Sequence, residues 1–353
     1  MSQCEQKISE MKFNFSRTGV HAPVNQPPAL NCYAEVRKAI IPTQDGGFQV
    51  RWSSPLAAAV PPELHGGTLR LIYNHVAKAA SYSMLSVLKA AAQRNHFKLS
   101  GPHPGEYARS TEALTAELQT VEPGGAWVNH AATVTQLLND PRFAWINVVR
   151  EPLDRAQSLY YYEVDGNIRG SKATAAYELR GSHPNPVCNC QRLEFSECVE
   201  QLLLTPSCNF TQGKAGRGHI GHSWAVDSQM RYFCEKRESC TFEAATRNYD
   251  DYLFVGISEE LDLTLRVFEE ILPSWFRGAS SNPVPHSDAA SNANRMAGTQ
   301  PAGAVSKTAR GLLMRDPFIA NEVRFYDFCR RKFWLAVVRV LGDTSGDVAP
   351  ASG

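Results

Sequence analysis

The stretch from Leu69 to Met84 contains the residue types that a protein needs to bind a phosphate group. It begins with an apolar run of strand length, passes through a short turn that carries Lys78, and enters an alanine- and serine-rich segment typical of a helix start. The first N–H groups of a helix lack intrahelical partners and lie at the positive end of its dipole, so they attract anions. Lys78 adds a charge, and Ser81 and Ser83 add hydroxyl donors. The pattern predicts an anion site where the strand meets the helix.

An ordinary strand-to-helix turn with an exposed lysine would have the same composition, because short motifs also occur by chance. The stretch is not a Walker-type phosphate loop, since the pattern G-x-x-x-x-G-K-[ST] requires glycines that are missing between Tyr73 and Ser81. The choice between the two interpretations therefore depends on the rest of the chain.

A second candidate site follows residues 143–149, an unbroken apolar run that is typical of a strand buried on both faces of a parallel sheet. Arg150 comes directly after this run, at the strand end where α/β folds bind ligands. It could bind a phosphate through two N–H groups. Ser158 lies eight residues later in the predicted helix, and it could reach the same ligand if the turn at Pro152 folds the helix back. The alternative is a structural arginine at the sheet edge, followed by tyrosines that face the core.

The rest of the sequence alternates between strand-like apolar runs and amphipathic helical patterns, which predicts a three-layer α/β domain with a mostly parallel central sheet. The expected strands lie at 69–73, 126–130, 143–149 and 252–257, with a further short one at 48–52. The expected helices lie at 81–96, 133–139, 153–162, 195–204 and 261–272, and a last helix begins at Pro317 with Asp316 as its N-cap. Ser258 is expected to cap the helix that follows the strand at 252–257.

Composition divides the chain into three regions. Residues 1–66 are rich in proline, alanine, glutamine and asparagine and are expected to be poorly ordered. Residues 67–341 are expected to form the domain, in which 278–303 is a loop or mobile lid because it is poor in hydrophobic residues. Residues 342–353 are expected to be a disordered tail.

The bulk numbers exclude several classes of protein. A chain of 353 residues with 43% hydrophobic content can bury one large core or two modest ones. The formal net charge of +1 gives no global field for binding nucleic acid, so an acidic partner would have to meet a local basic patch. No run of about 18 apolar residues is present to span a membrane, and the N-terminus lacks the apolar core of a signal peptide.

The cysteines indicate an oxidising compartment. Six of the nine lie close together in the sequence: Cys188, Cys190, Cys198, Cys208, Cys234 and Cys240. They contain no CxxC pair, so the usual zinc-ribbon spacing is missing. Disulfides between Cys198 and Cys208 and between Cys234 and Cys240 would each close a short loop, as in lumenal or extracellular proteins. Glycosylation sequons at Asn14 and Asn209 agree with this setting.

Taken together, the two stretches resemble the sulfotransferases that use 3′-phosphoadenosine 5′-phosphosulfate (PAPS), and more narrowly the uronyl/heparan sulfate 2-O-sulfotransferase family. The family's Y-N-R-V-x-K-x-x-S loop, which holds the 5′-phosphosulfate, is similar to Tyr73–Ser81. Its I-N-V-[IV]-R-[DE]-P-x-[ED]-R-x-x-S-x-Y-Y segment, which binds the 3′-phosphate, is similar to residues 146–161. Further similar segments, which extend the resemblance over roughly residues 68–340, lie at 232–240, 253–256, 276–279 and 325–326.

The resemblance implies a P-loop-like nucleotide-binding sulfotransferase fold. It also implies an enzyme that moves the sulfuryl group of PAPS to the 2-hydroxyl of a uronic acid in a glycosaminoglycan of the heparan or dermatan/chondroitin type. His130 matches the family's catalytic base, and a neutral imidazole can take the proton of an attacking hydroxyl near pH 7. Lys78 would stabilise the charge on the oxygen that bridges sulfur and phosphate. The scheme requires no metal.

The resemblance further implies which residues form the site. Those that would contact PAPS are Lys78, Ala79, Ala80, Ser81, Tyr82, Ser83, Arg150, Ser158 and Arg295. Arg295 is the best candidate in a loop that is basic in the family and poor in charge here. His75 and Arg155 would contact the acidic substrate. His75 stands where the family has an arginine, which implies a different affinity or choice of substrate, and Ala77 stands where proline or glycine is common.

The expected partner is an acidic polysaccharide and not a nucleic acid, and the resemblance implies a homotrimer as the candidate assembly. It also implies a type II membrane protein of the Golgi lumen. Membrane association would then come from a segment that this sequence does not contain.

Two other functions stay open. An ATP- or GTP-dependent phosphotransferase is disfavoured by the missing glycines and by the lack of an acidic Mg²⁺ ligand after residues 143–149. A catalytically silent glycan-binding relative is disfavoured because Lys78, His130, Arg150 and Ser158 are all present. His75 in place of an arginine keeps this alternative open. Magnesium-dependent nucleotide binding would identify the first alternative, and glycan binding without sulfate transfer would identify the second.

Overall fold

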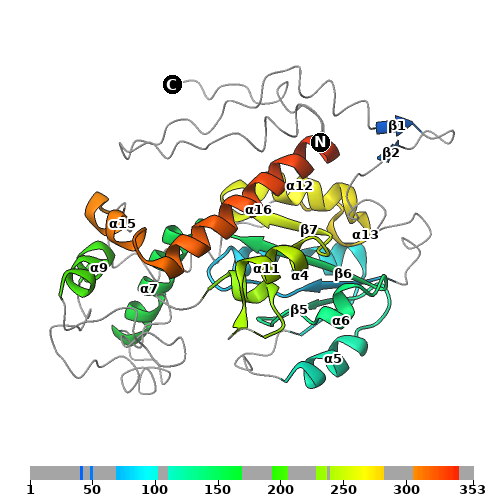
Figure 1. The fold of residues 1–353 in the computed structure, drawn as a ribbon. Coiled ribbons are helices and arrows are strands. Elements are labelled where there is room, and N and C mark those ends of the chain that lie inside the picture. The colour runs from blue at the N-terminus through cyan, green and yellow to red at the C-terminus, as the bar shows by residue number, and fades with distance from the viewer. Residues whose placement is uncertain are drawn as a thin grey trace.

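The computed structural model describes residues 40–42, 48–50, 69–101, 110–168, 193–205, 228–236, 239–281 and 305–341. A five-stranded sheet forms its centre (Figure 1). The strand order is β4-β5-β3-β6-β7. The strands are β3 (Arg70–Tyr73), β4 (Leu99–Ser100), β5 (Ala126–Val128), β6 (Phe143–Val149) and β7 (Phe254–Ile257). Each neighbouring pair in this sheet is parallel, so the predicted α/β fold with a parallel central sheet is confirmed.

The pairing register brings three strand ends to one edge of this sheet. At the end of β3, Tyr73 lies opposite Val128 of β5 and Ile146 of β6. β6 continues beyond that point and pairs with β7 as far as Val149. The segments that follow these strands therefore begin at the same edge, which is where α/β folds bind ligands.

A separate antiparallel pair is formed by β1 (Ile40–Pro42) and β2 (Phe48–Val50). β2 lies within the strand predicted at 48–52. Three predicted regions lie wholly or mostly outside the described residues: the N-terminal segment 1–66, the loop 278–303 and the tail 342–353.

Helices connect the strands and pack around the sheet. Their bounds are α4 (Ser81–Asn95), α5 (Thr111–Gln119), α6 (Thr135–Leu138), α7 (Pro152–Ile168), α9 (Phe195–Leu204), α11 (Phe242–Tyr249), α12 (Leu261–Ile271), α13 (Pro273–Phe276), α15 (Lys307–Leu313) and α16 (Pro317–Leu341). The 3-10 helices η5 (Met230–Phe233) and η7 (Ser258–Glu260) precede α11 and α12. The long helix α16 contacts α7, α11, α12 and β7, so it links distant parts of the sequence (Figure 1). Within the described ranges, none of the helices is both long and apolar enough to span a bilayer.

The start of α16 is set by the predicted N-cap. Asp316 Oδ1 accepts hydrogen bonds from the backbone N–H groups of Phe318 and Ile319, at 2.8 and 3.3 Å. Pro317 occupies the first helical position, where its missing N–H leaves no donor unsatisfied. The predicted cap is therefore confirmed.

Ser258 does not cap a helix, and that prediction was wrong. It begins the 3-10 helix η7, and α12 starts only at Leu261. The end of β7 is tied to α12 by Thr264 instead, whose hydroxyl lies 3.1 Å from both the backbone N and the backbone O of Ile257. This close approach requires Gly256, because a Cβ atom there would lie 2.2 Å from Thr264 Cγ2.

The buried apolar side chains form two clusters. The larger one surrounds the sheet and includes side chains of α4, α12 and α16. The smaller one is formed by α7, α9, α15 and the first turns of α16. α16 contributes Phe325 and Phe333 to the larger cluster, and Ile319 and Val323 to the smaller one. The chain therefore buries two cores that share one helix.

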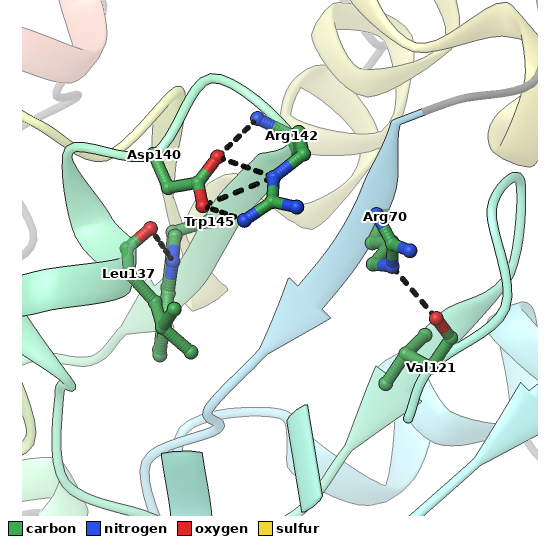
Figure 2. A network of polar contacts seen from close by, with 6 residues as sticks. All are labelled: Arg70, Val121, Leu137, Asp140, Arg142 and Trp145. Carbon is green, nitrogen blue, oxygen red and sulfur yellow. Dashed lines mark hydrogen bonds and ion pairs between the residues drawn. The ribbon is translucent and has the colours of Figure 1, made fainter. Parts of the chain in front are cut away.

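Polar contacts close the edge of the sheet at which β3 and β6 begin. Figure 2 shows the residues that make them: Arg70, Val121, Leu137, Asp140, Arg142 and Trp145. Arg142 Nη2 lies 2.6 Å from Asp140 Oδ2, and the hydrogen-bonded guanidinium lowers the pKa of the Asp140 carboxyl. Arg70 Nε donates to the carbonyl of Val121 over 2.7 Å. Arg70 and Arg142 are thus hydrogen-bonded within the protein, at the edge of the sheet opposite the one where α/β folds bind ligands.

One predicted disulfide, Cys234–Cys240, is present. Cys198 is also disulfide-bonded, but its predicted partner Cys208 lies outside the described residues. Cys329 has a free, buried thiol.

Candidate active site

The turn between β3 and α4 has an unusual backbone for residues that are not glycine. Lys78 and Ala80 have φ angles of 64° and 57°, in the left-handed region that residues with a Cβ atom disfavour. Strained residues of this kind persist where surrounding packing holds them, and they concentrate at functional sites. Val76 and Ala79 are fully buried and anchor the turn. Turns with left-handed residues can direct successive N–H groups toward one anion.

α4 begins directly after this turn, at Ser81, as predicted. Its N-cap residue Ala80 has no side-chain acceptor, and its first turn has no acidic residue. Neither a capping side chain nor a carboxylate therefore competes with an external anion at this helix end. Among the predicted contacts on α4, Ser81 is buried, Ser83 is half-buried and Tyr82 is exposed.

Lys78 and Arg150, from separate stretches of the sequence, lie together. Arg150 follows β6, and its Nη1 atom donates a hydrogen bond to the carbonyl oxygen of Lys78 over 3.3 Å. Burial, together with the charge of Arg150, lowers the pKa of Lys78 to about 8. Two cations held this close repel each other, and a phosphate or sulfate group between them would offset that repulsion. The donors at this point therefore fit an anionic ligand.

α7 carries two further predicted site residues. Arg155 is buried, and its Nη1 atom donates to the carbonyl of Ala77 over 3.2 Å. Arg155 thus lies beneath the turn, and its contact with the acidic substrate stays a prediction. Ser158 lies about one helical turn further along, on the same side of α7, and is partly exposed. Arg295 lies outside the described residues.

His130 follows β5 and lies against the turn after β3. Its Nδ1 atom is 2.9 Å from the carbonyl oxygen of His75. A carbonyl can only accept, so this contact places the imidazole proton on Nδ1 and makes Nε2 the basic nitrogen of the ring. The side chain of Asn129 accepts from the backbone N–H of His130 over 2.8 Å and fixes the chain at this point. His130 therefore has the tautomer that a general base acting through Nε2 requires.

The ring of His75 packs against this imidazole, with the two ring centroids 3.8 Å apart. Burial, and then the charge of His130, holds the pKa of His75 well below its usual range, so His75 is neutral near pH 7. The His75 side chain is 9% exposed, and its Nδ1 atom has no hydrogen-bond partner among the described residues. A neutral, buried ring in contact with His130 suits a role in orienting that residue better than contact with a polyanion.

A buried hydrogen-bond network, which sequence analysis did not identify, joins these segments. Asn147 of β6 donates from Nδ2 to the carbonyl and side-chain oxygens of Asn74, at 2.9 and 3.0 Å. Asn74 donates to the carbonyl of Tyr232 over 2.9 Å and accepts from the Tyr252 hydroxyl over 3.0 Å. Thr133 donates to the same carbonyl of Tyr232 over 2.8 Å. The sequence contained a signal for this network: Asn74 directly follows one apolar run, and Asn147 lies within another. Polar side chains at such positions are expected to be buried and must therefore find partners.

Comparison with known proteins agrees with this geometry. The model of the sulfotransferase family matches residues 66–244, a range that contains the turn after β3, His130 and Arg150. This chain belongs to the sulfotransferase family. Its parallel α/β sheet, with the candidate anion site at the carboxyl ends of the strands, fits the nucleotide-binding fold of sulfotransferases.

The relatives of this sulfotransferase family member include enzymes named for transfer to the 2-position. The chain is similar to the uronyl 2-sulfotransferase homolog pip of Drosophila melanogaster, with 25% identity over 282 residues, 75% of this chain and 52% of that protein. It is 25% identical to uronyl 2-sulfotransferase of Homo sapiens over 228 residues, 60% of this chain and 50% of that protein. It is 22% identical to heparan sulfate 2-O-sulfotransferase 1 of Xenopus laevis over 288 residues, 79% of this chain and 74% of that protein. The chain spans about half the length of the first two relatives.

Proposed function

We propose that this chain moves the sulfuryl group of PAPS to the 2-hydroxyl of a uronic acid in a glycosaminoglycan of the heparan or dermatan/chondroitin type. One observation carries the proposal. The turn 74–80 contains both Lys78 and the carbonyl of His75, to which His130 Nδ1 is hydrogen-bonded. A candidate base and a candidate anion site are thus parts of one structural unit. The names of the relatives supply the class of reaction and of acceptor.

PAPS would supply a sulfuryl group on a phosphate leaving group. The N–H groups of Ala79–Ser83 and the ammonium group of Lys78 would bind its 5′-phosphosulfate. Arg150 would bind its 3′-phosphate through charge-assisted hydrogen bonds, with Ser158 as a second donor. Arg295 is proposed as one further contact.

During transfer, His130 would take the proton of the acceptor hydroxyl at Nε2, while its Nδ1–H stays bonded to the His75 carbonyl. Lys78 would stabilise the negative charge that develops on the oxygen left on the phosphate. Both roles fit a pH near 7, because imidazole is then largely neutral and Lys78, with a pKa of about 8, is largely protonated.

The proposed setting is the Golgi lumen, with residues 67–341 as the catalytic domain of a membrane-attached protein. The disulfides at Cys198 and Cys234–Cys240 support an oxidising compartment. The proposed partner is an acidic polysaccharide, and the proposed assembly is a homotrimer.

A catalytically silent, glycan-binding relative is the competing proposal. It rests on His75, which stands where the family has an arginine and so removes a cation from the site. The tautomer of His130 favours the enzyme, since a binding protein has no need of a basic Nε2 at this position.

Transfer of labelled sulfate from PAPS to desulfated heparan, chondroitin, dermatan and a neutral polysaccharide tests the proposal. The wild type should label a uronic-acid polymer and leave the neutral polymer unlabelled. His130→Asn should abolish labelling yet bind adenosine 3′,5′-bisphosphate as the wild type does. The asparagine amide can still donate to the His75 carbonyl, but it has no basic nitrogen.

Other outcomes would identify the alternatives. Tight binding of adenosine 3′,5′-bisphosphate without labelling of any acceptor would favour the silent relative. Absence of bisphosphate binding by the wild type would overturn the proposed function. Loss of bisphosphate binding in His130→Asn would show that His130 supports the fold of the site and is not its base.

A further inference from the structure

Three buried polar side chains outside the proposed PAPS contacts connect α16 and α7 to the site. Glu322 of α16 and Arg155 of α7 are each 3% exposed, and Gln229, just before η5, is 0% exposed. Buried charged and polar groups are costly unless they have partners. Their partners therefore show which parts of the molecule they hold in place.

Glu322 binds the backbone of the segment before η5. Its Oε2 atom accepts from the N–H of Gln229 over 2.8 Å. Its Oε1 atom accepts from the hydroxyl of Ser228 and, over 3.4 Å, from the N–H of Met230. Burial raises the pKa of Glu322, while the positive charge of Arg155 and these donors counteract the rise. The carboxyl group thus fixes the backbone from which the Gln229 side chain extends.

Gln229 uses its side-chain amide to hold both backbone polar groups of Arg150. Its Oε1 atom accepts from the Arg150 N–H over 3.1 Å, and its Nε2 atom donates to the Arg150 carbonyl over 2.9 Å. Arg150 lies one residue beyond Val149, the last position of β6 that pairs with β7. The amide continues the hydrogen bonding of the strand by one residue. It thereby sets the direction in which the Arg150 side chain leaves the sheet.

Arg155 connects the same carboxyl group to the other half of the site. Its guanidinium donates to the carbonyl of Ala77, the residue before Lys78, and its charge acts on Glu322. Glu322 is therefore connected to the site in two ways. It holds Gln229, which binds the backbone of Arg150, and it interacts with Arg155, which binds the turn that carries Lys78.

We propose that Gln229 is a positioning residue for Arg150, held in place by Glu322, and that it determines how tightly the site binds the 3′-phosphate of the sulfuryl donor. The inference rests on the proposed function, because it takes Arg150 as the 3′-phosphate contact. Gln229 acts through the backbone of Arg150. It should therefore affect nucleotides that carry a 3′-phosphate and not those that lack one.

Calorimetric titration of the full chain with two nucleotides tests this role. Gln229→Met removes both hydrogen bonds to Arg150 at nearly constant side-chain volume. It should weaken binding of adenosine 3′,5′-bisphosphate by about tenfold and leave binding of adenosine 5′-phosphosulfate, which has no 3′-phosphate, unchanged. Gln93→Met, at an exposed position of α4, is the matched control and should change neither affinity. Should Gln229→Met fail to fold, Gln229→Asn gives the same comparison with an amide too short to reach both groups.

Arg150→Ala distinguishes failure of the inference from failure of the proposed function. If Arg150→Ala leaves bisphosphate affinity unchanged, Arg150 is not the 3′-phosphate contact, and both the assigned contact and its positioning are overturned. If Arg150→Ala weakens binding and Gln229→Met does not, the positioning role alone is overturned. Equal weakening of both nucleotides by Gln229→Met would also overturn it, because that result indicates a general structural role. In the double variant, Gln229→Met should add no loss to that of Arg150→Ala, since both changes act through one side chain.

Discussion

Lys78 combines a left-handed backbone with an ammonium group whose pKa is lowered to about 8 by burial and by Arg150. An anion binds the protonated form and not the neutral one, so ligand affinity is retained below the pKa of the free protein and lost above it. Affinity for adenosine 3′,5′-bisphosphate should therefore fall by up to about tenfold per pH unit above about pH 8. Calorimetry across this range measures the fall, and the protons taken up on binding near pH 8 can be measured from its buffer dependence.

Lys78→Arg is the control for this prediction, because a guanidinium stays protonated throughout the range. Its affinity should not depend on pH between about pH 7 and pH 10, whatever its absolute value. An equal fall in Lys78→Arg would attribute the pH dependence to another group.

The contact between His75 and His130 should influence the pH dependence of sulfate transfer. His75→Arg would place a permanent charge against His130, since the two rings lie 3.8 Å apart. A neighbouring cation disfavours the imidazolium form. The acid limb of the pH profile of kcat/KM should then move to lower pH by about one unit. His75→Gln, which stays neutral, should leave the limb in place, and an unmoved limb in His75→Arg would mean that a group other than His130 limits the rate at low pH.

At the scale of elements, the turn between β3 and α4 should tolerate glycine better than a β-branched residue at Ala80. The φ angle of 57° suits glycine, whereas valine is strongly disfavoured there. Ala80→Val should lower the free energy of unfolding by about 1–3 kcal/mol and weaken binding of adenosine 3′,5′-bisphosphate, while Ala80→Gly should preserve binding. Urea unfolding and calorimetry provide the two measurements. A valine variant as stable as the wild type would contradict the left-handed turn.

The contact between β7 and α12 leads to a further prediction. Gly256→Ala would place a Cβ atom 2.2 Å from Thr264 Cγ2 and should lower the free energy of unfolding by about 2 kcal/mol or more. Thr264→Ser removes Cγ2 but keeps the hydroxyl that bonds Ile257, so the double variant should recover part of the loss. Urea unfolding of the four proteins gives the coupling energy, and strictly additive effects would argue against the contact.

Local patterns predicted most of these elements. α9 has the predicted bounds, Phe195–Leu204, because its amphipathic face begins at a capping box formed by Glu194 and Glu197. β6 also matches the predicted run, since a segment that is apolar except for Asn147 suits a strand buried on both faces. The strand expected at 252–257 begins instead at Phe254. The end of an element depends on tertiary contacts, such as that of Thr264 with β7, which a local pattern does not contain.

The candidate site was less predictable than the fold. Lys78 and Arg150 could be identified because each is a charged residue that comes soon after an apolar strand run, where α/β folds bind ligands. The left-handed backbone of the turn could not be predicted, since its usual sequence signal is a glycine and residues 74–80 contain none. Gln229 and Glu322 have no local signal at all, because the hydrogen bonds that define their role join residues 79 and 93 positions apart.

At the scale of the whole molecule, the disulfide Cys234–Cys240 stabilises a segment on which several elements depend. It lies next to Tyr232, whose carbonyl accepts from Asn74 and Thr133. Replacing both cysteines with serine should lower the free energy of unfolding by about 2 kcal/mol, as measured by urea unfolding without reductant. Addition of reductant should then affect the wild type more than the serine variant, whose remaining sensitivity reports the other disulfides of the chain, that of Cys198 included. Equal stability of the two proteins without reductant would contradict the prediction.

His130 takes its orientation from the carbonyl of His75, which belongs to the same turn as Lys78. In evolutionary terms, this shared turn limits the ways in which a descendant could lose the proposed activity. A change that remodels the turn would remove the proposed proton acceptor and the proposed anion site in one step and leave an inert scaffold. A change at His130 alone would leave a protein that still captures the nucleotide and competes for it with active relatives. Inactive descendants should therefore fall into these two classes, which nucleotide affinity alone can separate.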